Sequence, residues 1–198
     1  MSSKRASLPI SLTSVGRFSF AQAREAGLSQ AQVARLESDK VIKKIARGIY
    51  EVSGRSLDPA TRDFAIACIS LGDDAVIGGL TALFYYGLAE EVPAQLWVLV
   101  PPHVYRSGRT FRLIRTKLDL NVGVEHHRDF RITSLERSIV DGFIFSSKIG
   151  EKIAYRAAVR AIRDKRTNAD KIFRLAQKLG EERKLAAHAQ AIFGGLEA

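Results

Sequence analysis

The chain has 198 residues, a length that fits one domain or two small ones. Its composition, with 46% hydrophobic and 26% charged residues, is that of a globular protein and excludes a disordered or fibrous chain. Lys and Arg outnumber Asp and Glu by 31 to 21, so the net charge is +10 and an anionic partner such as nucleic acid is favoured. A single cysteine excludes an internal disulfide and a thiolate metal site. With neither a membrane-length apolar run nor a signal-peptide pattern, the chain is expected to be cytoplasmic, with no membrane association.

The positive charge lies toward both ends of the sequence, whereas the middle is close to neutral. Near the end of the first basic part, Ser53, Gly54 and Ser56 interrupt the apolar pattern and predict a boundary. The predicted fold class is α+β, with a small N-terminal domain followed by a mixed α/β domain that ends in a helical segment. The predicted bounds are 1–55 for the first domain and 56–198 for the second, divided into an α/β part at 56–147 and a helical part at 148–198.

Two capping boxes predict two short helices in succession. Ser19 and Ser29 are each followed three residues later by a glutamine, Gln22 and Gln32, which is the pattern of a helix N-terminus. Gly27 lies between the two helices and supplies the positive φ that a tight turn requires. Two short helices joined at a glycine are typical of a helix-turn-helix unit.

A hairpin is predicted directly after the second helix. That helix is expected to span residues 30–39 and to bury Val33 and Leu36, which lie one turn apart. In residues 41–52, two β-branched stretches flank Arg47-Gly48, which favours a β-hairpin. A basic hairpin in this position corresponds to the wing of a winged helix-turn-helix domain. The alternative is a small α+β domain with a solvated hairpin.

The helix and the hairpin together predict a surface that binds double-stranded DNA. With Val33 and Leu36 buried, Arg35 and Ser38 face outward, where a recognition helix enters the major groove. An arginine there suits a guanine edge and a glutamine suits an adenine edge, while basic hairpin residues suit phosphates or the minor groove. The expected DNA-binding residues are Gln30, Gln32, Arg35 and Ser38 on the helix and Lys43, Lys44 and Arg47 on the hairpin.

The middle of the sequence predicts alternating helices and strands. Asp58-Pro59 is read as an N-cap and first residue of a helix that ends at Leu71. Thr133 and Glu136 are read as a capping box that opens a helix to about Phe145. The other predicted elements are a short helix at 81–88 and strands at 96–100, 109–117 and 122–126.

Nothing in the sequence has the spacing of a catalytic or metal-binding motif. The adjacent pairs Asp73-Asp74, Glu90-Glu91 and His126-His127 place neighbouring side chains on opposite faces of a strand, so they do not converge on a metal. We therefore expect no enzymatic activity, no metal and no cofactor. The remaining enzymatic alternative is a divalent-metal nuclease assembled from Asp63, Asp74 and Glu91.

The last fifty residues are predicted to be helical, with one basic stripe. The stripe residues recur every three to four positions: Lys148, Lys152, Arg156, Arg160 and Arg163. Two functional roles stay open, a second DNA contact or a surface for an acidic partner, beside the simpler interpretation of solvated helix faces.

Three stretches of this chain contain short motifs whose order and spacing are informative. The first comprises residues 18–29 with Leu36 and the hairpin residues 47–50. The second comprises residues 79–83 with Tyr86-Gly87-Leu88 and leads into the strand at 97–100. The third comprises residues 132–141. In the order and spacing of these motifs the chain resembles the AbiE-type antitoxin family of type IV abortive-infection toxin–antitoxin systems, and the third stretch resembles the family's Arg-Thr…Asp helix start.

The resemblance implies a protein with two activities. The N-terminal domain would bind an operator and repress its own operon, and the C-terminal domain would act as antitoxin against a nucleotidyltransferase-like toxin, without requiring a direct complex with it. The alternative function is a ligand-responsive winged-helix transcriptional regulator that has no toxin partner.

Overall fold

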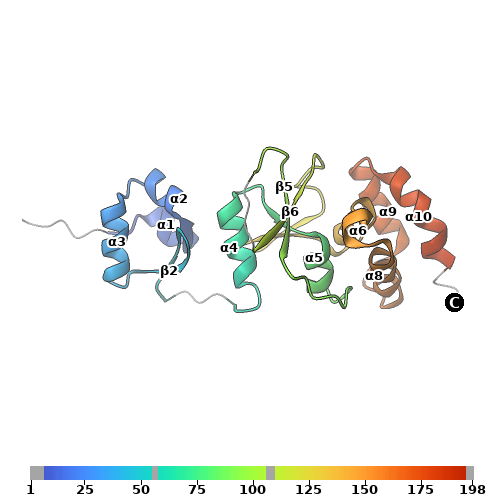
Figure 1. Ribbon diagram of the computed structural model, residues 1–198, viewed down its shortest axis with the longest axis horizontal. Helices are drawn as coiled ribbons and strands as arrows, with labels where there is room; N and C mark the ends of the chain where they lie inside the picture. The colour runs from blue at the N-terminus through green and yellow to red at the C-terminus, as the bar shows by residue number, and fades with distance from the viewer. Residues whose placement is uncertain (1–6, 55–57, 106–109, 195–198) are drawn as a thin grey trace, which may run out of the picture. The chain divides into compact units, whose positions relative to one another are not determined.

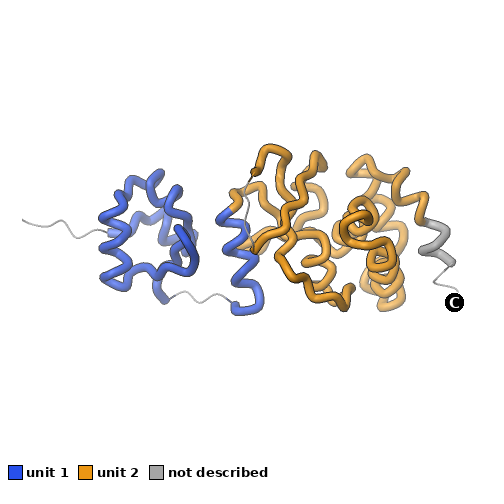
Figure 2. The backbone as a smooth tube through the Cα atoms, viewed as in Figure 1, with its two compact units in different colours: residues 1–70 blue, residues 71–198 orange. Residues whose placement is uncertain are grey.

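The computed structural model describes residues 7–54, 58–105 and 110–194, the end of the last range by its backbone alone. The chain is a mixed α+β protein that divides into two compact units, residues 1–70 and residues 71–198 (Figure 1, Figure 2). Each unit has its own sheet and its own buried hydrophobic cluster.

Three short helices open the first unit: α1 (Ile10–Val15), α2 (Phe20–Glu25) and α3 (Gln30–Ser38). At the start of α2, Ser19 Oγ accepts from the Gln22 N–H at 3.2 Å and Gln22 Oε1 accepts from the Ser19 N–H at 2.8 Å. Ser29 and Gln32 repeat this arrangement at the start of α3, with distances of 3.3 and 2.8 Å. Both capping boxes are therefore confirmed. Gly27, with φ of 86°, makes the turn between the two helices, as its position predicted.

The first unit also contains a three-stranded antiparallel sheet, in the order β1-β3-β2. Its strands are β1 (Arg17–Ser19), β2 (Ile42–Ala46) and β3 (Ile49–Val52). The hairpin of β2 and β3 with its turn at Arg47-Gly48 is confirmed, and β1 is an additional strand that pairs with β3. Phe18 of β1 stacks on Tyr50 of β3, with ring centroids 5.9 Å apart, in the same buried cluster as Val33 and Leu36 of α3. The sheet and α3 thus share one core.

Helix α4 (Arg62–Leu71) begins later than predicted. Asp58 accepts the Ala60 N–H on its side chain and the Thr61 N–H on its carbonyl, so Asp58-Pro59 opens a turn and not the helix. The Arg62 guanidinium donates to the Ile45 carbonyl oxygen at 3.2 Å, which ties the start of α4 to the first unit. The division between the two compact units falls at Ser70, near the end of α4. Residues 55–57, where the boundary between 55 and 56 is predicted, lie outside the described residues.

The second unit is built on a five-stranded mixed sheet in the order β6-β5-β4-β8-β7. Its strands are β4 (Val76–Ile77), β5 (Leu96–Val100), β6 (Phe111–Arg115), β7 (Val124–His126) and β8 (Arg131–Thr133). Strands β5 and β6 are parallel, as are β4 and β8, whereas β4–β5 and β7–β8 are antiparallel. The three predicted strands correspond to β5, β6 and β7, although Arg109, the first residue predicted for the second of them, lies outside the described residues.

The described residues of the second unit also form six helices: α5 (Gly79–Tyr85), α6 (Leu135–Ile144), α7 (Ser146–Ile149), α8 (Glu151–Arg163), α9 (Ala169–Lys178) and α10 (Glu182–Gly194). Helices α8, α9 and α10 pack around α6 (Figure 1). The face of α8 toward α6 consists of fully buried alanines: Ala154, Ala157, Ala158 and Ala161. A Cβ on Gly142 of α6 would lie 3.1 Å from the Ala154 Cβ, so small residues allow α6 and α8 to approach closely.

The capping box predicted at Thr133 and Glu136 is wrong. Ser134 is the N-cap of α6, and its hydroxyl accepts the Arg137 N–H at 3.2 Å. The Glu136 carboxylate instead accepts a hydrogen bond from the Thr167 hydroxyl at 2.8 Å. Thr167, which is distant in sequence, therefore binds the Glu136 carboxylate that the local pattern assigned to the cap.

Candidate functional site

Helix α3 presents a polar outer face over a buried inner face. Val33 and Leu36 are 2% and 0% exposed, whereas Gln30, Arg35 and Ser38 are exposed. The helix therefore buries the two residues expected to anchor it, and three of the four residues expected to read bases lie in solvent.

The fourth of these residues, Gln32, is also exposed, but its side chain is engaged. Its Oε1 accepts the Ser29 N–H at 2.8 Å as half of the capping box. Bidentate recognition of adenine needs both the oxygen and the nitrogen of a glutamine amide. The cap occupies one lone pair of the Gln32 oxygen and fixes the orientation of its amide, which makes Gln30 the better candidate for an adenine contact.

Arg35 lies near an acidic neighbour on the same helix. Its Nε is 3.8 Å from Asp39 Oδ2, and the two side chains are 45% and 56% exposed. An ion pair as exposed as this contributes about 0–1 kcal/mol. Asp39 therefore opposes movement of Arg35 toward a base edge only weakly.

The hairpin carries Lys43, Lys44 and Arg47, and all three are exposed. Lys43 lies opposite Glu51 in the strand register, so a carboxylate stands beside this part of the basic surface. The Glu51 carboxylate, however, pairs with Arg17 of β1 at 2.8 Å, with side chains only 12% and 6% exposed. Arg17 thus neutralises Glu51, a pairing that sequence reasoning missed because β1 was not predicted.

The second basic surface does not form one continuous helical stripe. Gly150, with φ of 102°, separates α7 from α8, so Lys148 lies on α7 and only the other four residues share α8. The reason is local, since the chain leaves the helical conformation at this glycine. On α8, the basic face lies opposite the buried alanines and consists of Lys152, Arg156, Arg160 and Arg163, all exposed.

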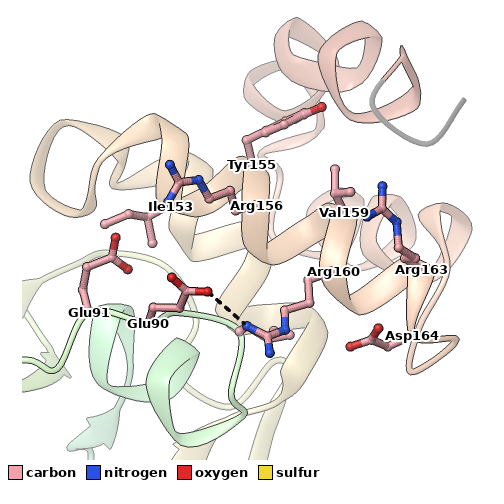
Figure 3. Close-up of a pocket in the computed structure, with 10 residues that line it drawn as sticks. Glu90, Glu91, Ile153, Tyr155, Arg156, Val159, Arg160, Arg163 and Asp164 are labelled. Atoms are coloured by element: carbon pink, nitrogen blue, oxygen red, sulfur yellow. Dashed lines mark ion pairs between the residues drawn. The ribbon is translucent and has the colours of Figure 1, made fainter. Parts of the chain in front are cut away.

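The three arginines of this face line a pocket of about 400 Å³ between α8 and the segment that follows α5 (Figure 3). The pocket residues are Leu88, Glu90, Glu91, Ile153, Tyr155, Arg156, Val159, Arg160, Arg163 and Asp164. Glu90 and Arg160 face each other across it, with a carboxylate-to-guanidinium distance of 4.0 Å. The position of Glu90 and Glu91 opposite the basic face could not be predicted, because these residues lie far from α8 in the sequence.

A buried ion pair occupies the centre of the second unit. Arg137 and Asp141 of α6 are both 0% exposed, with Nε 2.8 Å from Oδ1. Arg137 also donates to the carbonyl oxygens of Asp119 and Val122, which fastens their loop to α6. Burial raises the pKa of Asp141 to about 6, while Arg137 acts in the opposite direction. An Arg and an Asp four residues apart on a largely apolar helix were the sequence signal for this pair.

Tyr86 makes a second hydrogen bond that connects distant parts of this unit. Its hydroxyl donates to the Thr133 carbonyl oxygen at 2.9 Å, and it is partly buried. Burial, followed by the nearby Glu125 carboxylate, raises the pKa of Tyr86 far above that of an ordinary tyrosine. Tyr86 therefore acts as a neutral hydrogen-bond donor that joins the end of α5 to β8.

The carboxylates considered for a nuclease are distributed over both units. Asp63 belongs to the first unit, and Asp74 and Glu91 belong to the second. Within the described residues, no group of three or more His, Cys, Asp or Glu side chains could hold a metal ion.

Among the helices of the described ranges, none combines the length and the apolar character that a membrane-spanning helix requires.

No protein-family model matches the chain, and no curated protein matches it in sequence. Among solved structures, the chain is similar to the crystal structure of RV2827C protein from Mycobacterium tuberculosis. The two are 12% identical with a TM-score of 0.49, and the superposition covers 90% of this chain and 76% of that chain. A similarity at this level says nothing about function.

Proposed function

We propose that the chain is a DNA-binding transcriptional autorepressor and the antitoxin of a type IV toxin–antitoxin pair. The observation that carries the DNA-binding part is the surface formed by α3 and the hairpin. Exposed Gln30, Arg35 and Ser38 lie on α3, and exposed Lys43, Lys44 and Arg47 lie on β2 and the turn that follows.

The order of elements in the first unit supports a winged helix-turn-helix domain. The chain runs helix, strand, helix, helix and hairpin, with the strands in the order β1-β3-β2. In that kind of domain, the helix after the glycine turn enters the major groove and the hairpin lies beside it on the backbone. Here α3 is the recognition helix, and the hairpin of β2 and β3 is the wing.

The chemistry of the exposed side chains divides the work of binding. Lys43, Lys44 and Arg47 contact phosphates and supply affinity that falls with salt concentration. Arg35 and Gln30 offer the donors and acceptors that recognise guanine and adenine edges and thereby supply sequence preference.

The antitoxin part rests on the resemblance of three stretches of sequence to the AbiE-type family. Under this proposal the second unit counteracts a nucleotidyltransferase-like toxin, with or without a direct complex. Growth rescue on co-expression with a nucleotidyltransferase-like toxin from the same operon supports this role. Normal repression without growth rescue would reject the antitoxin role and leave DNA binding intact.

The experiment that tests DNA binding is a gel-shift titration on the chain's own upstream DNA against random DNA, at two salt concentrations. The wild-type chain is expected to prefer its own DNA at both. Arg35→Ala should cost about 1–3 kcal/mol on that DNA and relax the preference at one base pair. Arg24→Ala, a change of another exposed arginine on the neighbouring helix α2, is the matched control and should leave the preference intact. Binding that is weak, indifferent to sequence and abolished by salt would refute the proposal.

The pocket beside α8 favours a second candidate function, a ligand-responsive regulator without a toxin. A concave site of about 400 Å³ lies in the size range of small-molecule sites. A small molecule that binds the second unit and changes operator affinity would distinguish this candidate from the antitoxin.

A further inference from the structure

The pocket beside α8 has two walls that the fold holds in place. One wall is the basic face of α8, whose opposite face is fixed by the buried alanines. The other wall is the segment after α5, where the N–H groups of Leu88 and Ala89 both donate to the Leu83 carbonyl oxygen, at 2.8 and 3.3 Å. The Arg166 guanidinium donates to the Tyr86 carbonyl oxygen and ties this segment to the end of α8. Both walls therefore exist before any ligand binds.

The walls carry opposite charges. Arg156, Arg160 and Arg163 project from α8, and Glu90 and Glu91 lie on the facing segment (Figure 3). Of the acidic side chains that the structure describes, only Glu90 lies within ion-pair distance of these arginines. That contact, to Arg160, is 4.0 Å long, with side chains 83% and 50% exposed. Such a pair is easily displaced, so the guanidinium and carboxylate groups can serve a ligand.

This mixture of charges suits a small molecule better than a nucleic-acid backbone. A row of phosphates laid along the arginines would also approach Glu90 and Glu91, and like charges at this range repel each other. A compact ligand with an anionic end and a separate set of hydroxyl donors meets both walls favourably. Arginine binds phosphate oxygens with paired N–H groups, and carboxylates accept hydrogen bonds from sugar hydroxyls.

The pocket also has apolar and aromatic lining. Leu88 is almost fully buried, and Ile153 and Val159 are partly buried on α8. Tyr155 lines the pocket too, with its ring directed away from Glu90 and Glu91 (Figure 3). A flat heterocyclic ring fits beside such side chains, because apolar and aromatic groups bury its faces. Phosphate, hydroxyl and ring chemistry occur together in a nucleotide.

We propose that this pocket binds a free ribonucleoside monophosphate. Arg156 and Arg160, one helical turn apart, hold the phosphate, and Glu90 moves from Arg160 to accept a ribose hydroxyl beside Glu91. The base lies on the apolar lining. The proposal is independent of DNA binding by the first unit, because binding of the nucleotide is measured directly.

Isothermal titration of the full chain with AMP, GMP, CMP and UMP, and separately with ribose 5-phosphate and inorganic phosphate, tests the proposal. At least one nucleotide should bind one site per chain about tenfold or more tightly than inorganic phosphate. Arg160→Gln should weaken that nucleotide by about tenfold or more, since a charge-assisted hydrogen bond is lost. Arg174→Gln, a change of an exposed arginine on α9 outside the pocket, is the matched control and should bind normally.

Glu91→Gln separates a nucleotide site from a simple anion site. This variant should lose preference for the ribonucleotide over its 2′-deoxy form while keeping its affinity for phosphate. Equal affinities of the wild-type chain for nucleotides, ribose 5-phosphate and inorganic phosphate would overturn the proposal. The absence of nucleotide binding would also overturn it, as would a chain that binds a short RNA but no free nucleotide. An Arg160→Gln variant that binds the nucleotide as tightly as the wild type would overturn it too. Circular dichroism of each variant checks that the fold is kept.

Discussion

Removing the Arg137 guanidinium tests how far the second unit depends on its buried ion pair. Arg137→Met keeps a long apolar side chain but removes the partner that lies 2.8 Å from Asp141, a residue with no exposed surface. The carbonyl oxygens of Asp119 and Val122 lose their donor as well. Loss of one partner of a buried pair costs about 3–5 kcal/mol, a large share of the roughly 5–15 kcal/mol that stabilises a typical domain.

The cost of this substitution should depend on pH. Burial raises the folded-state pKa of Asp141 to about 6 from 3.8, so the folded state holds this proton more tightly than the unfolded state does. The stability that this group contributes is therefore fully present below pH 3.8 and declines as the pH rises to about 6. Without Arg137 the pKa rises further, since only the guanidinium opposes the effect of burial. We expect Arg137→Met to be less damaging at about pH 5.5, where the lone carboxyl group stays protonated, than at about pH 8.

Urea unfolding followed by tryptophan fluorescence measures both effects. The chain has a single tryptophan, Trp97, which is 4% exposed in the core of the second unit and so reports on that unit. The double variant Arg137→Met/Asp141→Leu is the control, because replacing both charges by apolar groups should recover much of the loss. A single-variant cost below about 1 kcal/mol at pH 8 would refute the reasoning. A double variant no more stable than the single one would refute it too.

Three further predictions concern the hairpin, the cap of α3 and a glycine in the second unit. Lys43→Gln should reduce the slope of log affinity against log salt by about one on DNA, and an unchanged slope would remove the hairpin from the DNA-binding surface. Ser29→Ala should destabilise the first unit by about 0.5–2 kcal/mol in denaturation followed by circular dichroism, and an unchanged midpoint would mean that the cap contributes nothing. Gly79→Ala should cost about 1–3 kcal/mol more than Gly87→Ala in urea unfolding, with equal losses contradicting this. Both glycines have positive φ, but a Cβ at Gly79 would lie 2.8 Å from the Trp97 ring. A Cβ at Gly87 would have no described atom within 4 Å apart from those of its chain neighbours.

Local signals predicted the first unit well, because its elements are stabilised by neighbours in sequence. Ser19 and Ser29 cap helices through residues three positions on, and the Arg47-Gly48 turn joins adjacent strands. The strand β1 was missed because it spans only Arg17–Ser19 and is held by its pairing with β3. No periodicity can be read from a segment that short.

In the second unit, tertiary contacts decided what local patterns could not. Strands β4 and β8 are two and three residues long. They are held by pairing with β5 and β7, respectively, and with each other, and their mutual contact joins distant parts of the chain. At the start of α6, Ser134 and not the predicted Thr133 is the N-cap, and Glu136 accepts a hydrogen bond from Thr167. The alternation of turn, strand and helix was predictable, whereas the strand order was not.

The candidate sites follow the same rule. The exposure of Arg35 and Ser38 follows from the burial of Val33 and Leu36 on the same helix, so the helical periodicity of the sequence predicted it. The hydrogen bond that the Gln32 amide oxygen accepts from the Ser29 N–H could also be predicted, because it is part of every capping box. Neither the break at Gly150 nor the carboxylates opposite α8 could be predicted from helical spacing alone.

The contrast between the two basic surfaces shows why net charge is a poor guide to function. A count of Lys and Arg treats the hairpin and α8 as equivalent, but their acidic neighbours differ in what they already bind. Glu51, beside Lys43, is held by Arg17 in a mostly buried pair and presents little charge to a ligand. Glu90, beside Arg160, is 83% exposed and only loosely paired, so the pocket presents a carboxylate and a guanidinium side by side to a ligand. The field over the hairpin is therefore positive and suits a continuous polyanion, whereas the field over α8 changes sign within one pocket and suits a small ligand with separate anionic and hydrogen-bonding groups.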